Sequence, residues 1–215
     1  MSAIRIGLTG PIGCGKSTVA GWVGERDGVV VVDADDLARQ VLDVQTPELA
    51  AVYARFGAAL AREDGSLDRA ALGRLVFADP TALRDLEAIV HPAVRRRMLA
   101  AVAEADAAGA AAIVIEAIKL VEGGLAALCD EVWLVTCDAT VQLERLSGRG
   151  SAPDDAAARI AVQGDLATRL APHATRVIDT SAGQAATRAL VEAAFTEALA
   201  GARSVRDNES PGPSR

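Results

Sequence analysis

The chain has 215 residues, which is enough for one domain with a sizeable hydrophobic core and insertions. Hydrophobic residues make up 51% and charged residues 24%, as in an ordinary globular protein, and with only 3% aromatic residues the core must be largely aliphatic. The formal net charge of -7 argues against non-specific nucleic-acid binding, because phosphate contacts need clustered Lys and Arg.

The cysteines and the N-terminus indicate a compartment. Cys14, Cys129 and Cys137 are odd in number and form no CxxC pair, so the sequence predicts neither a disulfide framework nor a zinc site. The N-terminus lacks the pattern of a signal peptide, and no apolar run approaches the roughly 20 residues that span a bilayer. We expect a cytoplasmic monomer or weak homo-oligomer with no nucleic-acid or membrane partner.

The chain opens with a strand, a glycine-rich turn, a helix and a second strand. Residues 3–9 form an apolar run, residues 17–26 have helical character, and residues 28–33 are a β-branched run that ends in a carboxylate. This order is typical of a βαβ unit. Apolar runs at 111–116, 131–136 and 175–179 predict further strands of a parallel sheet covered on both faces. The expected fold is an α/β three-layer sandwich within residues 1–202.

Two long helical stretches interrupt this pattern. Residues 36–109 are too long for a simple crossover and look wholly helical, with turn signals at 46–47, 64–65, 79–80 and 91–92, so we expect an inserted subdomain that covers or binds a substrate. The polar stretch 143–170 carries four arginines and suits a lid. A packing helix is expected at 183–200, and the Pro/Gly/Ser-rich residues 203–215 predict a disordered tail.

Residues 10–17, GPIGCGKS, match the phosphate-loop pattern GxxxxGK[ST] directly after the first strand. Glycines let successive backbone N–H groups point at phosphate oxygens, Lys16 reaches the β- and γ-phosphates, and Ser17 offers its hydroxyl to Mg²⁺. The alternative is a glycine-rich turn that fits by accident, with a chance expectation on the order of one in a thousand. The predicted nucleotide-binding residues are Gly13, Cys14, Gly15, Lys16, Ser17 and Thr18. Cys14 acts there through its backbone N–H, although a thiol beside a helix N-terminus is also prone to oxidation.

A phosphate loop indicates nucleotide binding but not the chemistry. The only asparagine, Asn208, lies in the tail, so the NKxD signature of GTPases is absent, and the chain is short for most motor ATPases. The predicted second strand leads into Asp33, Asp35 and Asp36, at the sheet edge where α/β folds bind ligands. A carboxylate there can take the proton of an attacking hydroxyl or hold water on Mg²⁺, whereas helix capping is the structural alternative. Lid arginines can neutralise a transferring phosphoryl group, or simply form a solvated helix face.

These residues resemble the dephospho-coenzyme A kinase family. Residues 6–18, IGLTGPIGCGKST, are similar to the family's LTGGIGSGKST opening, and residues 31–39, VVDADDLAR, are similar to its VIDAD segment. Residues 89–92, IVHP, match its HP element, and residues 142–163 resemble its lid, which ends in Arg-Ile-x-x-Gln. The resemblance covers residues 4–179.

The resemblance implies transfer of the γ-phosphate of ATP, with Mg²⁺, to the ribose 3′-hydroxyl of dephospho-CoA, the last step of CoA synthesis. By position it makes Asp35 the catalytic base, Asp33 a supporting carboxylate and Arg149 the lid arginine nearest to the phosphates. Together with Lys16, these are the predicted catalytic residues. Arg39 and His91 fall near the acceptor or at the hinge of the subdomain, and the insertion becomes the acceptor-binding domain. The alternatives are a solvent-facing Arg39 and a His91 that precedes a helix start.

Three departures from the family keep other functions open. Pro11 replaces the second glycine of the loop, Thr180 replaces an asparagine after the fifth strand, and Lys119 stands where the family usually has a Pro-Leu-Leu-x-Glu element. Lys119 favours a different small-molecule kinase, acting on a nucleoside or a metabolite alcohol. A non-catalytic nucleotide-binding regulator is the second alternative, and the intact Asp33 and Asp35 argue against it.

Overall fold

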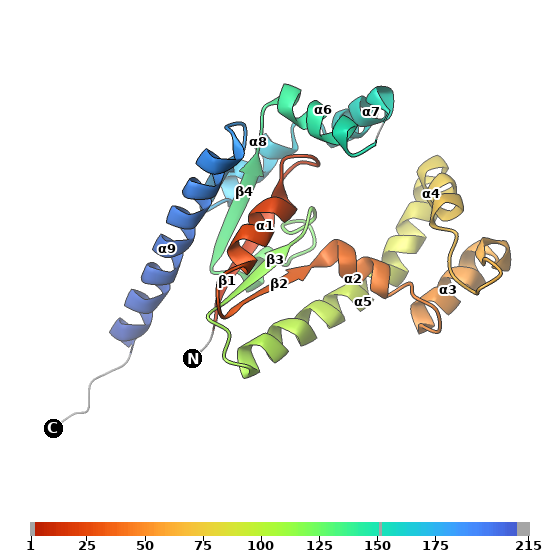
Figure 1. Ribbon diagram of the computed structural model, residues 1–215. Coiled ribbons are helices and arrows are strands. Elements are labelled where there is room, and N and C mark those ends of the chain that lie inside the picture. The colour runs from red at the N-terminus through yellow and green to blue at the C-terminus, as the bar shows by residue number, and fades with distance from the viewer. Residues whose placement is uncertain (1–2, 151, 210–215) are drawn as a thin grey trace. The chain divides into compact units, whose positions relative to one another are not determined.

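The computed structural model describes residues 3–150 and 152–209, and the chain divides into two compact units (Figure 1). Unit 1 comprises Met1–Val32 and Ala105–Arg215, and unit 2 comprises Asp33–Glu104. Unit 2 overlaps the helical insertion expected at 36–109. Each unit has its own hydrophobic core.

Unit 1 is built on a five-stranded sheet with the strand order β2-β3-β1-β4-β5. The strands are β1 (Ile4–Thr9), β2 (Val29–Asp33), β3 (Ala112–Glu116), β4 (Glu131–Thr136) and β5 (Arg176–Asp179). β1 pairs in parallel with β3 and β4, and β4 pairs in parallel with β5. Each strand begins at the predicted residue or at the one after it, so the predicted α/β fold is confirmed.

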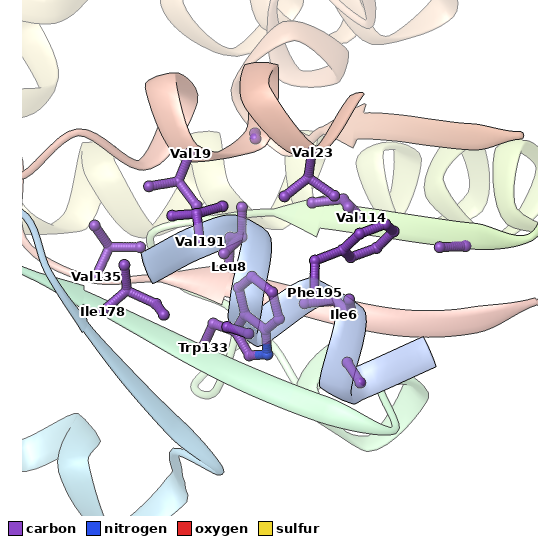
Figure 2. Close-up of a cluster of buried hydrophobic side chains, with 14 of the residues drawn as sticks. Ile6, Leu8, Val19, Val23, Val114, Trp133, Val135, Ile178, Val191 and Phe195 are labelled. Atoms are coloured by element: carbon purple, nitrogen blue, oxygen red, sulfur yellow. The ribbon is translucent and has the colours of Figure 1, made fainter. Parts of the chain in front are cut away.

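Helices cover both faces of this sheet because successive strand side chains alternate between the faces. α1 (Lys16–Gly24) and α9 (Gln184–Glu209) pack on one face, where Trp133 and Val135 of β4 lie in a cluster with Phe195 of α9 (Figure 2). Leu134, between them in β4, packs instead against Leu166 and Leu170 of α8 (Leu166–Leu170). The result is the expected three-layer arrangement.

The polar stretch predicted as a lid forms three helices in unit 1. α6 (Ala139–Gly148) and α7 (Pro153–Gln163) contact each other, whereas α8 is anchored in the core beside β4. Short 3₁₀ turns occur at Ala126–Leu128 and Ala171–His173. α9 continues to Glu209, past the end expected near residue 200, so its backbone includes residues 203–209 of the predicted tail. Residues 210–215 of that tail lie outside the described residues.

Unit 2 is formed mainly by helices: α2 (Ala34–Gln40), α3 (Pro47–Phe56), α4 (Arg69–Ala78) and α5 (Pro80–Ala107), with a 3₁₀ turn at Ala58–Leu60. Thr46 caps α3 by accepting a hydrogen bond from the Leu49 N–H at 3.2 Å, as a threonine before Pro47 predicts. The expectation of a wholly helical stretch was incomplete, because Ala61 and Leu67 form an isolated antiparallel bridge around the turn at Gly65. α5 runs beyond the end of this unit and leads back to β3.

The turn predicted at His91-Pro92 was wrong. α5 passes through Pro92 without a break, although a proline lacks the N–H for the helical hydrogen bond. Packing compensates for that loss, since Ala93 is buried in the core of unit 2 and Ile89, Val90 and Val94 pack against the same cluster.

Throughout the described part of the chain, no helix is both long enough and apolar enough to cross a membrane.

Candidate nucleotide-binding and active site

The phosphate loop lies between β1 and α1 in unit 1. Gly13 and Gly15 have φ angles of 79° and 90°, in the left-handed region that favours glycine. At Gly10 the requirement is steric, because an added Cβ would lie 2.1 Å from the backbone oxygen of Val135. These glycines allow the chain to turn tightly from β1 into the N-terminus of α1, where backbone N–H groups attract anions.

Lys16 is held against the loop that precedes it. Its side chain is buried, and Nζ donates hydrogen bonds to the backbone oxygens of Gly10 at 2.9 Å and Pro11 at 3.1 Å. A buried ammonium group needs such partners, and these two fix its charge beside the loop backbone. The replacement of a loop glycine by Pro11 is therefore compatible with this geometry, since it is the carbonyl of Pro11 that is used.

Ser17 pairs with an acidic side chain from the neighbouring strand. Its hydroxyl donates to Oε1 of Glu116 over 2.7 Å, and Glu116 is a buried residue at the end of β3. The structure thus places a carboxylate next to the hydroxyl predicted to face Mg²⁺. Hydroxyl and carboxylate oxygens are the donors that a hard cation of this kind prefers.

Two glutamines hold the loop at Ile12. The Ile12 N–H donates to Oε1 of Gln163 at 2.8 Å, and the Ile12 oxygen accepts from Nε2 of Gln142 at 2.7 Å. Gln142 belongs to α6 and Gln163 is the last residue of α7. Both backbone polar groups of Ile12 are therefore tied to the segment that resembles the lid.

An arginine of α6 ties the loop to the end of β5. Arg145 donates to Oγ1 and to the backbone oxygen of Thr180, each at 2.7 Å. The Thr180 hydroxyl is within hydrogen-bond distance of the backbone oxygens of Cys14, at 2.8 Å, and Thr136, at 3.1 Å, to which it can donate. Thr180 is buried, so its hydroxyl is part of a fixed network. The residue that departs from the family pattern is thus a structural link between the loop and α6.

A pocket opens beside the loop and the start of α1. It includes three predicted residues, Gly15, Thr18 and Arg149, and Arg149 is the C-cap of α6. The other lining residues come from α1, α6, the end of β5 and the start of α9: Val19, Trp22, Arg145, Thr180, Gln184 and Thr187. An aromatic ring, arginines and hydroxyls next to a phosphate loop suit the base and sugar of a nucleotide.

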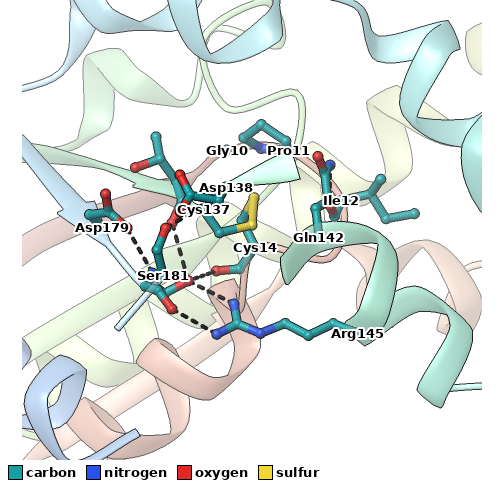
Figure 3. The surroundings of a disulfide bond; sticks show 12 residues. Gly10, Pro11, Ile12, Cys14, Cys137, Asp138, Gln142, Arg145, Asp179 and Ser181 are labelled. Atoms are coloured by element: carbon teal, nitrogen blue, oxygen red, sulfur yellow. Dashed lines mark hydrogen bonds between the residues drawn. A yellow bond between two sulfur atoms is a disulfide. The ribbon is translucent and has the colours of Figure 1, made fainter. Parts of the chain in front are cut away.

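The cysteines contradict the expectation drawn from their number. Cys14 of the phosphate loop and Cys137, which follows β4, form a disulfide with Cα atoms 5.1 Å apart (Figure 3). The expectation was wrong because the fold brings together two residues 123 positions apart, which no sequence spacing reveals. Cys129 is the free cysteine of the described chain, and burial raises the pKa of its thiol to about 12.

The remaining predicted residues belong to unit 2. Asp33 caps α2, with Oδ1 accepting from the N–H groups of Asp35 at 2.7 Å and Asp36 at 3.3 Å, so the capping alternative holds for Asp33. Arg39 is exposed and forms an ion pair with Asp36, and its backbone oxygen accepts from Arg69. His91 is exposed within α5. These residues are brought together only in part, since Asp35 and Arg39 lie in α2, Asp33 caps it and His91 lies in α5.

Sequence reasoning did not predict how five residues organise the phosphate loop: Glu116, Gln142, Arg145, Gln163 and Thr180. Glu116 had a usable signal, because it ends a predicted strand and the carboxyl ends of parallel strands meet at one edge. The other four stand in helical or loop segments whose spacing gives no hint of a long-range bond. No cluster of three or more histidine, cysteine or acidic side chains suited to a metal was found among residues 3–150 and 152–209.

Comparisons with known proteins identify the family. Residues 4–186 match the family model of dephospho-CoA kinase. A dephospho-CoA kinase of Symbiobacterium thermophilum is 45% identical over 197 residues, covering 91% of this chain and 82% of that protein. One of Moorella thermoacetica is 42% identical over 209 residues and covers 96% of each chain.

The solved structures that resemble this chain include other kinases. The dephospho-CoA kinase of Campylobacter jejuni is 26% identical with a TM-score of 0.69, covering 92% of this chain and 98% of that one. A shikimate kinase from Bacteroides thetaiotaomicron, 16% identical with a TM-score of 0.51 over 88% of this chain and 94% of that one, shares the fold alone. The chain belongs to the dephospho-CoA kinase family.

Proposed function

We propose that the protein transfers the γ-phosphate of ATP to the ribose 3′-hydroxyl of dephospho-CoA, which gives CoA and ADP. The observation that carries this proposal is the formed phosphate loop, with Lys16 fixed by the loop carbonyls, in a member of the dephospho-CoA kinase family. Membership of a kinase family argues against the alternative of a regulator without turnover. It also argues for dephospho-CoA over another small-molecule alcohol.

Phosphoryl transfer depends on positioning and on neutralising negative charge rather than on covalent chemistry. In our proposal Lys16 neutralises the β- and γ-phosphates, while the N–H groups from Gly13 to Thr18 cradle them. Arg145 and Arg149 line the adjoining pocket and add positive charge around the nucleotide. Gln142 and Gln163 act as positioning residues, because they bind the backbone oxygen and the backbone N–H of Ile12.

We propose Mg²⁺ as the metal that accompanies ATP, held by Ser17 and, directly or through water, by Glu116. The pair fits the ion because both side chains offer oxygens, and Oγ of Ser17 lies 2.7 Å from Oε1 of Glu116. When bound, Mg²⁺ neutralises charge on the phosphate oxygens. A site of this kind needs few protein ligands, since phosphates and water supply the rest.

The acceptor hydroxyl needs a base, and unit 2 supplies the candidates. Oδ1 of Asp33 already accepts hydrogen bonds from two backbone N–H groups as the cap of α2. That occupation supports Asp35 as the group that takes the proton and Asp33 as the residue that orients its helix. Arg39 and His91 remain the proposed acceptor contacts, and a cytoplasmic location remains a prediction.

The test is an acceptor panel with identification of the product. Purified protein is incubated with Mg-ATP and with dephospho-CoA, shikimate or a nucleoside, and the phosphorylated product is located by phosphorus NMR. We expect phosphate on the ribose 3′-oxygen of dephospho-CoA and little turnover with the other alcohols. Equal or faster transfer to another alcohol would reject dephospho-CoA as the preferred acceptor and draw attention to the exposed Lys119.

A further inference from the structure

The disulfide joins two parts of the nucleotide site that are far apart in sequence. Cys14 lies inside the phosphate loop, and Cys137 lies in the short connection between β4 and α6 (Figure 3). α6 begins two residues after Cys137 and carries Gln142 and Arg145, which contact the loop and the Thr180 network. The bond therefore ties the loop to the base of the segment that holds it.

The two sulfur atoms differ in their access to solvent. Cys14 is 1% exposed and belongs to the core cluster of unit 1, whereas Cys137 is only partly buried against that cluster. A dissolved reagent can therefore reach Cys137 first. Cys14 lies beside the N-terminus of α1 and can close the bond from the buried side.

We propose that Cys14 and Cys137 are a reversible thiol–disulfide site whose oxidation state is coupled to nucleotide binding. The reagent class is a low-molecular-weight disulfide in the oxidising direction and a small thiol in the reducing direction.

The exchange balances in two steps. The Cys137 thiolate attacks one sulfur of the small disulfide, which forms a mixed disulfide and releases one small thiol. The Cys14 thiolate then attacks the Cys137 sulfur, which closes the internal bond and releases the second small thiol. The two protein thiols lose two electrons and two protons in all, and the reagent gains them as two thiols.

The third cysteine does not compete in this exchange. Burial raises the pKa of the Cys129 thiol to about 12, and the Cys129 Sγ donates to the backbone oxygen of Leu125 at 3.5 Å. Thiolate is the reactive form, so Cys129 remains a thiol. It provides a matched control for the cysteine substitutions.

The conformation of the phosphate loop with the disulfide closed indicates which oxidation state binds nucleotide more tightly. Lys16 already contacts the Gly10 and Pro11 carbonyls, and Gly13 and Gly15 already have the conformations that form the cradle. A cross-link at Cys14 limits the other conformations of the loop, so less order must be created when phosphate binds. The oxidised protein therefore binds nucleotide more tightly. It also releases ADP more slowly, and turnover falls where release is the slow step.

Coupling of this kind is reciprocal. If oxidation tightens ADP binding by a given factor, saturating ADP favours the disulfide over the dithiol by the same factor. This inference depends on the nucleotide site of the proposed function but not on the acceptor. It can therefore be tested without dephospho-CoA.

The experiment measures the ADP dissociation constant by calorimetry on the full chain, oxidised and then reduced, with mass spectrometry to confirm a two-proton difference. We expect the oxidised form to bind about 5-fold more tightly, at the low end of typical coupling. A second titration poises the protein between oxidised and reduced glutathione, and ADP is expected to shift the disulfide equilibrium by the same factor.

Two variants serve as controls. Cys129→Ser is expected to keep both the redox dependence of ADP affinity and the shift of the disulfide equilibrium by ADP. Cys137→Ser is expected to bind ADP like the reduced wild type under oxidising and reducing conditions. If Cys137→Ser does not fold, the comparison of wild-type protein before and after reduction is sufficient. Equal ADP affinity in the two states, or a disulfide equilibrium that does not change with ADP, would overturn the coupling but not the proposed function. Absence of ADP binding in both states would overturn the proposed function as well.

Discussion

The two units of this protein prepare their predicted functional residues to different degrees. In unit 1 the phosphate loop is bonded on several sides, by Lys16, by two glutamines and by the Thr180 network. In unit 2 the predicted residues have local helix roles or lie exposed, as Asp33 does in capping α2 and Arg39 does in pairing with Asp36. The unit assigned to ATP thus contains a formed site, and the unit assigned to the acceptor contains separate candidates.

This difference accords with the chemistry of each ligand. Phosphate recognition uses backbone N–H groups and one lysine, which a single loop can organise in advance. Recognition of an extended alcohol substrate uses side chains from several helices, and these can become ordered when the substrate binds. We therefore expect substitutions in unit 1 to affect all nucleotide chemistry, and substitutions in unit 2 to affect only the step that involves the acceptor.

The largest effect is expected for Lys16→Ala. Removing the buried ammonium group from the loop should lower kcat/KM for transfer by about 10²–10³-fold, as when a preorganised charge-stabilising group is lost. Initial rates of ADP formation measure this, and the melting temperature shows whether the variant is folded. A folded variant with nearly full activity would contradict the preformed site in unit 1.

Asp35→Asn should lower kcat by about 100-fold while leaving ATP affinity unchanged, if Asp35 takes the proton of the acceptor. Asp33→Asn separates capping from catalysis, because asparagine is an equally good cap for α2. Asp43→Asn, an exposed carboxylate of the same unit, serves as a control without loss. Unchanged turnover in Asp35→Asn would remove it as the base.

Gln163→Ala tests the link between α7 and the phosphate loop. It leaves the Ile12 N–H without its partner, which should weaken ATP binding or turnover by about 10-fold, the equivalent of one hydrogen bond to a polar group. Val162→Ala changes the adjacent residue, which is 87% exposed, and should have no effect. Equal kinetics in the two variants would show that the glutamine does not position the loop.

The smallest effect concerns the free energy of unfolding and compares the Arg176–Glu131 ion pair of unit 1 with the Arg55–Asp85 ion pair of unit 2. Burial raises the pKa of Glu131, but hydrogen bonds from Arg176 and Trp133 outweigh it, so the pKa lies below its usual value. Glu131→Gln should lower the free energy of unfolding by about 1–2 kcal/mol at neutral pH. Asp85→Asn, which breaks the more exposed pair with Arg55, should cost at most about 0.5 kcal/mol.

The pH dependence of the Glu131 effect has a definite sign. A lowered pKa in the folded state gives stability that is present above the unfolded pKa of about 4.3 and is lost as pH falls through the folded pKa. The difference between wild type and Glu131→Gln should therefore shrink below about pH 4. Urea unfolding across pH measures it, and a gap that widens in acid would contradict the assignment.

Much of the fold follows from local patterns. Buried parallel strands appear as continuous apolar runs, and the phosphate loop has its own spacing, so both were predicted to within a residue. The turn at Pro92 was wrong because the burial of Ala93 and its neighbours in unit 2 outweighs the local cost of proline. The Cys14–Cys137 pair, the glutamines at Ile12 and the role of Thr180 depend on residues brought together by the sheet, which local spacing does not encode.

The central claim is that ATP bound at the preformed phosphate loop of unit 1 gives its γ-phosphate to dephospho-CoA. The most direct test is the rate of ADP formation from Mg-ATP with and without dephospho-CoA, with Lys16→Ala as the inactive reference. We predict a slow rate with ATP alone and a large increase when dephospho-CoA is added, with one CoA formed for each ADP. ADP formation that ignores dephospho-CoA would contradict the claim.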